Sequence, residues 1–150
     1  MVEEPALVDI SALGGVRSYE RLRLQHLDGL RSLHGLEGLT WVDDELFLQD
    51  LGLQSVEALA SLKTVGGDVD LWQLWDVTDL HGLENLRSVG GYLKVGNDPS
   101  LEDISGLVPL ESVGGNLYIQ LNPLLPQSSI DLVLADLDVG GSIVIQNNGP

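Results

Sequence analysis

The sequence has no cysteine among its 150 residues. This absence excludes disulfides, thiolate metal sites and cysteine nucleophiles within the chain. It leaves the compartment open, because a cysteine-free protein persists in either redox environment. The sequence also has no apolar run close to the roughly 20 residues that a membrane-spanning helix needs, so we expect no direct insertion into a membrane.

Basic residues are scarce: seven Lys and Arg stand against 23 Asp and Glu, giving a formal net charge of −16. Phosphate backbones repel such a polyanion, so nucleic acid is not an expected partner. The acidic start Met1-Val2-Glu3-Glu4 is unlike the basic first region of a secretory signal. With 43% hydrophobic residues and 18 glycines, the composition is that of a folded chain, and we expect one domain over 1–150.

A repeat of about 24 residues runs along the chain. Val-Gly-Gly recurs at spacings of 24, 24 and 26 residues, starting at Val65, Val89, Val113 and Val139. Apolar residues with the period of two that is typical of a strand follow each copy: Val69 and Leu71, Leu93 and Val95, Leu117 and Ile119, Ile143 and Ile145. Two earlier copies are altered, with Val42-Asp43-Asp44 in one and a shorter Tyr19-Glu20 in the other. Six copies of one strand are therefore predicted.

The second half of each repeat has apolar residues every third position instead of the helical 3.6. The pattern begins with Leu30, Leu33, Leu36 and Leu39 and recurs in copies that end at Leu62, Leu86 and Leu110. An α-helix would rotate such a pattern off one face, so a polygonal coil is favoured. The sequence therefore predicts a largely all-β fold, a right-handed β-helix or leucine-rich-repeat-like solenoid of about six coils with a period of 23–26 residues and short parallel strands.

Turn residues mark the corners of the predicted coils. We expect each Gly-Gly pair to allow positive φ and a close approach of backbones before its strand. Turn dipeptides follow the later strands, at Asp98-Pro99, Asn122-Pro123 and Asn148-Gly149. Leucine takes this place in the first three repeats, which are therefore expected to turn differently: Leu27, Leu51 and Leu74.

The two ends of the chain depart from the repeat. Residues 127–137 are predicted to form a short amphipathic helix in the last full coil, because four apolar residues follow helical spacing: Ile130, Val133, Leu134 and Leu137. Ser128 or Ser129 is the expected N-cap, with Asp131 in the first turn. The predicted order is an N-terminal cap (1–18), the coils (19–138) and a last strand (139–150).

These motifs carry a family resemblance. The Val-Gly-Gly-x-Leu-x-Ile strand at 113–119, the Asn122-Pro123 corner and the Leu-x-x-Ile-x-Gly-Leu run at 101–107 resemble receptor L-domain repeats, the leucine-rich ligand-binding modules of the epidermal growth factor and insulin receptor families. The chain looks more like related bacterial Val-Gly-Gly repeat proteins of mostly unknown role. The resemblance covers about residues 10–148. It implies a ligand-binding module that is secreted or on the cell surface, although the disulfides of the receptors are missing.

Histidine and acidic residues offer possible metal sites. His34 and His81 occupy one repeat position that serine or glutamate fills elsewhere, which indicates a polar corner more than a metal or catalytic site. Asp43, Asp44 and Asp68 could gather three carboxylates around a loosely bound Ca²⁺. Such acids more often form a solvated face, so we expect neither a metal nor another cofactor.

Enzymatic activity is not expected either. Repeats of 23–26 residues leave no room for the long loops with which β-helical polysaccharide-cleaving enzymes build a cleft. The sequence also has no Gly-x-Ser-x-Gly, no phosphate-binding glycine loop and no His-Glu-x-x-His. We therefore predict no catalytic residues.

The outward face of the predicted strands is the most informative feature. Alternation places four of the seven aromatic residues on it, with charged residues between them. Aromatic side chains often anchor interfaces, although they also suit strands for their own packing. The predicted ligand-binding residues are Phe47, Trp72, Tyr92, Tyr118, Asp70 and Lys94, with Trp75 near the edge.

Two functions follow from this sequence. The first is a non-catalytic recognition module that binds a protein or a glycan across the strand face. The second is a structural protein that assembles through the open ends of its sheet.

Overall fold

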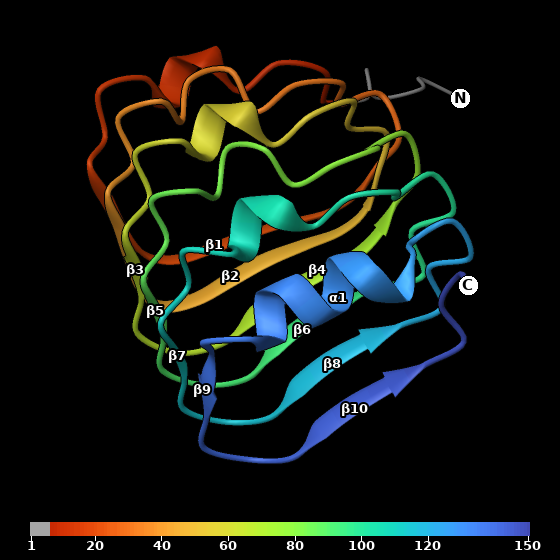
Figure 1. Ribbon diagram of the computed structural model, residues 1–150. Helices are drawn as coiled ribbons and strands as arrows, with labels where there is room; N and C mark the ends of the chain where they lie inside the picture. Colours follow the sequence, from red (N-terminus) through yellow and green to blue (C-terminus); the bar gives the residue numbers. More distant parts are fainter. Residues whose placement is uncertain (1–6) are drawn as a thin grey trace.

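The computed structural model describes residues 7–150, so residues 1–6 of the expected N-terminal cap lie outside the described part. Within 7–150 the protein is mostly β, with one parallel sheet of ten strands and one α-helix (Figure 1). The strands are β1 (Ser18–Leu27), β2 (Trp41–Leu51), β3 (Thr64–Val65), β4 (Val69–Leu74), β5 (Ser88–Val89), β6 (Leu93–Gly96), β7 (Ser112–Val113), β8 (Leu117–Gln120), β9 (Asp138–Val139) and β10 (Ile143–Gln146).

The sequence repeat sets the strand pairing. The sheet runs β10-β8-β6-β4-β2-β3-β5-β7-β9, with β1 also on β2. The start of β2 pairs with β3 and its end pairs with β4, so each later repeat supplies a short strand before its Gly-Gly pair and a longer one after it. Corresponding residues of successive repeats lie opposite one another, as in Leu46, Val69, Leu93, Leu117 and Ile143. The predicted alignment of the repeats is confirmed.

The first two strands are longer because their repeats lack the glycine pair. Asp43 and Asp44 continue β2 through the place where later repeats have Gly-Gly. The repeat that holds β1 is one residue shorter there, and the structure absorbs this difference by a register shift between Tyr19 and Arg21. The missing residue in the sequence pattern therefore appears as an irregularity in the ladder.

The hydrophobic core lies behind the sheet. The apolar residues with period three are buried, and the segments that carry them form 3₁₀ turns instead of α-helices, at η1 (Ser11–Leu13), η2 (Glu57–Leu59) and η3 (Ser105–Leu107). The last repeat is the exception, since Ile143 is 49% exposed whereas its counterpart Leu117 is fully buried. Among the described strands only β8 pairs with β10, so the far side of this repeat has no cover.

The Gly-Gly pairs serve close packing and not positive φ. Among residues 7–150, positive φ occurs in glycine only at Gly15, Gly35 and Gly82, so that part of the expectation is wrong. The first glycine of each pair instead lies against the backbone of the preceding repeat, and a Cβ at Gly90 would overlap the carbonyl oxygen of Gly66. The absence of a side chain allows the repeats to stack at this corner.

A left-handed residue ends the main strand of every repeat. The residues concerned have φ between 53° and 63°: His26, Asp50, Gln73, Asn97, Leu121 and Asn147. The early repeats therefore turn in the same way as the later ones, contrary to the expectation from Leu27, Leu51 and Leu74. Asparagine and aspartate tolerate this backbone conformation, while leucine, glutamine and histidine adopt it at a cost of roughly 1–2 kcal/mol.

A polar ladder follows the left-handed residue in the last three repeats. The side chain of Asn122 accepts a hydrogen bond from the Asp98 N–H (3.2 Å) and donates one to the Val95 carbonyl (3.3 Å). Asn148 repeats this arrangement on Asn122 and Ile119. Asp98 begins the ladder, and its Oδ1 accepts the Leu74 N–H at 2.7 Å. Burial raises the pKa of Asp98 to about 8, so this carboxyl holds its proton at neutral pH.

The predicted helix forms, with different ends. Helix α1 spans Gln127–Leu134, shorter than the expected 127–137, and no side chain caps it. Ser129 was a candidate N-cap, but it lies inside the helix, where its buried hydroxyl accepts the Ile104 N–H at 3.1 Å. Asp131 falls beyond the first turn. Within 7–150, no helix is both long and apolar enough to span a bilayer.

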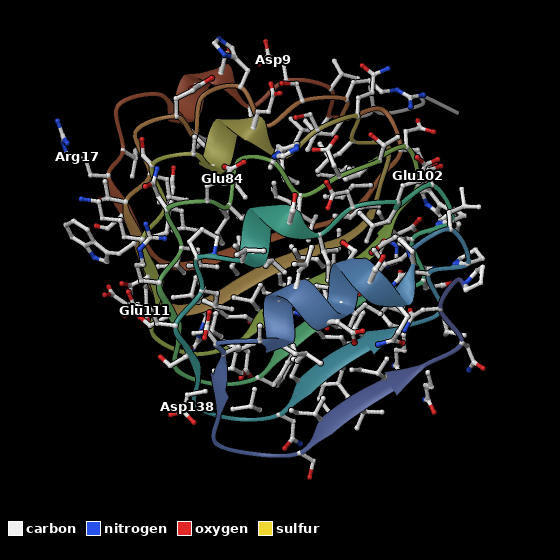
Figure 2. All side chains as sticks on the ribbon, viewed as in Figure 1. Asp9, Arg17, Glu84, Glu102, Glu111 and Asp138 are labelled. Atoms are coloured by element: carbon white, nitrogen blue, oxygen red, sulfur yellow. The ribbon has the colours of Figure 1, made fainter. Side chains whose placement is uncertain are left out.

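Charge is distributed unevenly along the stack of repeats. Backbone hydrogen bonds connect Arg17, Thr40, Lys63, Arg87, Glu111 and Asp138 in one column. Figure 2 shows Arg17 at one end of this side of the molecule, with Glu111 and Asp138 toward the other. Beyond Lys94 the sequence has seven acids and no Lys or Arg: Asp98, Glu102, Asp103, Glu111, Asp131, Asp136 and Asp138. The acidic excess is therefore greatest in the last repeats.

Candidate ligand-binding surface

Six of the seven predicted site residues come together on the outward side of the sheet, which we call the strand face. Phe47, Asp70, Lys94 and Tyr118 lie in one row across β2, β4, β6 and β8. Trp72 lies in the next row, opposite Gly96, and Tyr92 immediately precedes β6. Their neighbours along the strands, such as Val69 and Leu71, are buried in the core, which directs this set outward.

The aromatic rings of the strand face are half-buried and held in place. Tyr92 and Tyr118 pack edge to face, with ring centroids 6.3 Å apart and planes at 78°, an arrangement that aromatic quadrupoles favour. The Tyr118 hydroxyl accepts a hydrogen bond from Asn116 Nδ2 at 2.7 Å. The strand face therefore presents ordered rings instead of freely projecting ones.

Two cations cover the other aromatic rings. The Arg23 guanidinium lies 4.4 Å from the centroid of Phe47, and Lys94 Nζ lies 3.8 Å from that of Trp72. Trp72 also packs over Gly96, where a Cβ would come within 2.6 Å of its Cζ3 atom. The ring thus lies along the sheet because the facing repeat has no side chain at this position.

Asp70 differs from the expected exposed carboxylate, because its neighbours cover it. The residue is only 5% exposed, and its Oδ2 lies 3.4 Å from Lys94 Nζ. Its other oxygen, Oδ1, is buried and has no hydrogen-bond partner among the described residues. Burial raises the pKa of Asp70, and the nearby Lys94 ammonium opposes this effect.

The remaining cations near the strand face are paired with acids of the next repeat. Arg21 contacts Asp44, and Arg23 Nη1 lies 3.2 Å from Glu45 Oε2. Asp68, in contrast, uses its Oδ1 to accept the Tyr92 N–H at 2.9 Å. Asp44 and Asp68 are thus engaged separately. Among residues 7–150, no group of three or more histidine and acidic side chains is placed to hold a metal ion.

Trp75 lies at the edge of the sheet, away from the other predicted site residues. Its indole N–H donates to Asp50 Oδ1 at 2.9 Å, while His26 Nδ1 lies 2.8 Å from the other oxygen of Asp50. The residue is 39% exposed. It borders a shallow cavity of about 300 Å³ with two prolines and Leu121 in its lining. Trp75 therefore belongs to a corner surface and not to the strand face.

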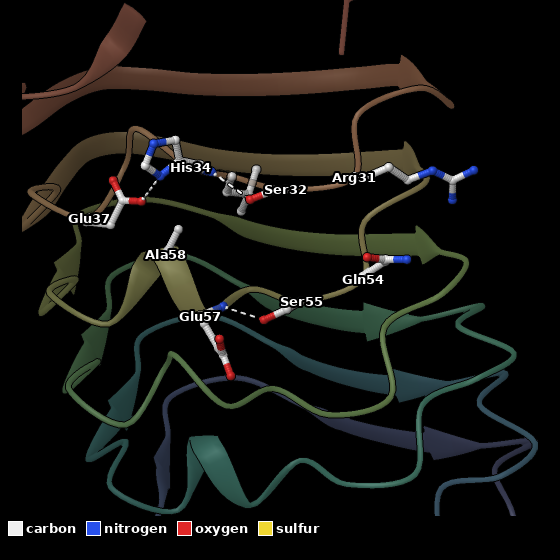
Figure 3. Close-up of a pocket in the computed structure, with 9 residues that line it drawn as sticks. Arg31, Ser32, His34, Glu37, Gln54, Ser55, Glu57 and Ala58 are labelled. Atoms are coloured by element: carbon white, nitrogen blue, oxygen red, sulfur yellow. Dashed lines mark hydrogen bonds and ion pairs between the residues drawn. The ribbon is translucent and has the colours of Figure 1, made fainter. Parts of the chain in front are cut away.

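A polar pocket of about 440 Å³ lies among the loops and 3₁₀ turns on the opposite side of the molecule (Figure 3). In it, His34 Nδ1 lies 2.6 Å from Glu37 Oε1, and the second oxygen of Glu37 accepts the Gly35 N–H at 2.8 Å. His81 and Glu84 repeat this pattern two repeats later. In both places the glutamate closes a turn at a glycine with positive φ, which gives these histidines a structural setting.

Comparison of the chain with protein-family models, with curated proteins and with solved structures finds no match. The candidate site is thus argued from this chain alone. Sequence reasoning missed Arg23 and Gly96 as parts of the strand face. Their signal was the register, which places Arg23 beside Phe47 and Gly96 beside Trp72.

Proposed function

We propose that the repeats are coils of a right-handed leucine-rich-repeat-like solenoid, about six in number, and that the chain is a non-catalytic module that binds a protein partner across the strand face. The observation that carries the proposal is the gathering of Phe47, Trp72, Tyr92 and Tyr118 on one outward surface in a chain with seven aromatic residues. Half-buried, pre-ordered rings offer a large contact area at a small entropic cost.

The resemblance to receptor L domains supports the same function, since those repeats bind ligands. It also supports a secreted or cell-surface location. The open and slightly polar strand face favours a protein over a small molecule, because small ligands bind in concave pockets that bury most of their surface. A glycan is the competing ligand, and the experiment that follows separates the two.

Substitution of the aromatic residues should reduce binding without unfolding the protein. On peptide and glycan arrays, Trp72→Ala and Tyr118→Ala should weaken the selected ligand by about 2 kcal/mol, or roughly 30-fold. Their cost in stability should stay within about 1 kcal/mol, because the rings lie outside the core. Trp41→Ala is the matched control, since Trp41 is an exposed tryptophan at the start of β2 and away from this cluster.

Two results would argue against this function. Either unchanged binding by both strand-face variants, or an equal loss in the Trp41 variant, would place the binding surface elsewhere. Selection of glycans alone by the wild-type protein would reject a protein partner.

A second candidate function, assembly through the C-terminal edge, has one specific observation in its favour. Ile143 on the edge strand β10 is 49% exposed, and residues 139–150 contain no charged side chain. Uncharged edge strands readily pair with other strands. If β10 mediates assembly, the mass measured by light scattering should rise with concentration, and Ile143→Lys should abolish the rise. A constant monomer mass up to millimolar concentration would exclude this function.

A further inference from the structure

The fold does not require a carboxylate at position 70. In the other repeats the same position holds Arg23, Phe47, Lys94 and Tyr118, so it accepts side chains of any chemistry. Yet Asp70 is 5% exposed and its Oδ1 has no hydrogen-bond partner. An unpaired buried acceptor costs about 1–3 kcal/mol, and more when it is charged. Such a group calls for a specific explanation, and a donor supplied by a bound partner is one.

The surroundings of Asp70 indicate what kind of donor fits. Lys94 Nζ lies between the Asp70 carboxylate, at 3.4 Å, and the face of the Trp72 ring, at 3.8 Å. The position thus already holds an ammonium group between a carboxylate and an aromatic ring. Both interactions favour cations and become stronger away from water.

A second example stands two strands away. The Arg23 guanidinium lies over the Phe47 ring and 3.2 Å from the Glu45 carboxylate. The strand face therefore uses the same pairing of ring and carboxylate for both types of basic side chain. The net charge of −16 adds long-range attraction for a basic partner.

We infer that Asp70 receives a lysine or arginine side chain of the protein partner, which takes the place of Lys94 between the carboxylate and the Trp72 ring. The inference rests on the proposed function, because it names the chemistry of the ligand for the same strand face. Lys94 has a long side chain that is 28% exposed, so its ammonium reaches water when displaced. The Oδ1 atom of Asp70 then gains the donor that it lacks in the free protein.

Short peptides test this directly. Three ten-residue peptides without other charges carry a central lysine, arginine or norleucine, and binding is followed by NMR shifts of the backbone amides. We expect the lysine and arginine peptides to bind the wild-type protein and the norleucine peptide to bind at least about tenfold more weakly. Failure of both basic peptides to bind at millimolar concentration would overturn the inference.

Charge-matched variants separate the site from general attraction. Asp70→Asn should weaken the basic peptides about tenfold, whereas Asp136→Asn, the same change at an exposed position outside the strand face, should leave them unchanged. Lys94→Gln should strengthen binding because it removes the internal competitor, whereas Lys63→Gln, the same charge change elsewhere, should not. Equal effects within either pair would overturn the inference, since the polyanion alone would then explain the binding.

The outcomes for the inference and for the proposed function are distinct. If the array-selected partner loses affinity in Trp72→Ala but not in Asp70→Asn, the proposed function stands and the inference fails. If Trp72→Ala binds that partner normally, the proposed function fails, whatever the peptides do.

Discussion

Asp98→Asn should stabilise the protein by on the order of 5 kcal/mol at pH 9 and remove most of the pH dependence between about pH 4 and pH 8. The folded state raises the pKa of Asp98 from 3.8 to about 8, chiefly through burial. The folded protein therefore binds a proton that the unfolded chain has released across this range. Each tenfold difference in proton affinity is worth about 1.4 kcal/mol, so wild-type stability falls as pH rises from 4 to 8 and then levels off.

The ladder explains why asparagine should suit this position. Asn122 and Asn148 donate their side-chain N–H groups to backbone carbonyls of the preceding repeat, and an asparagine at 98 has the same groups without an ionisable proton. Urea unfolding of both proteins from pH 4 to pH 9 measures the difference. Parallel stability curves would show that Asp98 does not govern this dependence. The reciprocal change, Asn122→Asp, adds a second buried carboxyl beside Asp98 and should destabilise the protein most above pH 8.

Leu93→Asp should cost at least about 4 kcal/mol or abolish cooperative unfolding, because it buries an unpaired charge in the middle of the leucine column. Leu93 is fully buried between Val69 and Leu117 in the register of the sheet. Leu93→Ala tests the same position with a variant more able to fold, at an expected cost of about 2–5 kcal/mol. Urea unfolding followed by circular dichroism measures both.

The last repeat provides the matched control for this substitution. Ile143 has the same register position as Leu93 but is 49% exposed, so Ile143→Asp leaves its carboxylate in water and should cost about 1 kcal/mol or less. Equal losses from the two aspartates would contradict the assignment of one buried column that opens at β10.

Much of the fold could be predicted because the repeat carries the register. Once Val65, Val89 and Val113 were aligned, the strand pairing and the buried leucine column followed from alternation and period. The left-handed corners could not be predicted in the same way. Histidine, glutamine and leucine at 26, 73 and 121 carry no propensity for positive φ, and the backbone adopts it there because stacking on neighbouring repeats outweighs the local cost.

The candidate surface was predictable to a similar extent. Alternation placed Phe47, Trp72 and Tyr118 on one face, because this depends only on register. The burial of Asp70 was not predictable, since it depends on how the long side chain of Lys94 folds back over its neighbours. Alternation gives the side of a sheet and says nothing of the rotamers that cover a short side chain.

The uncovered last repeat also shapes the motion of the molecule. In a stack where each repeat contacts only its neighbours, local opening begins where one neighbour is missing. Strand β10, paired only with β8 among the described strands, is therefore the first to fray. Asp70 and Trp72 on β4 lie three strands from that edge, so fluctuations at the terminus decay before they reach them. The aromatic cluster thereby keeps a rigid geometry next to a labile edge.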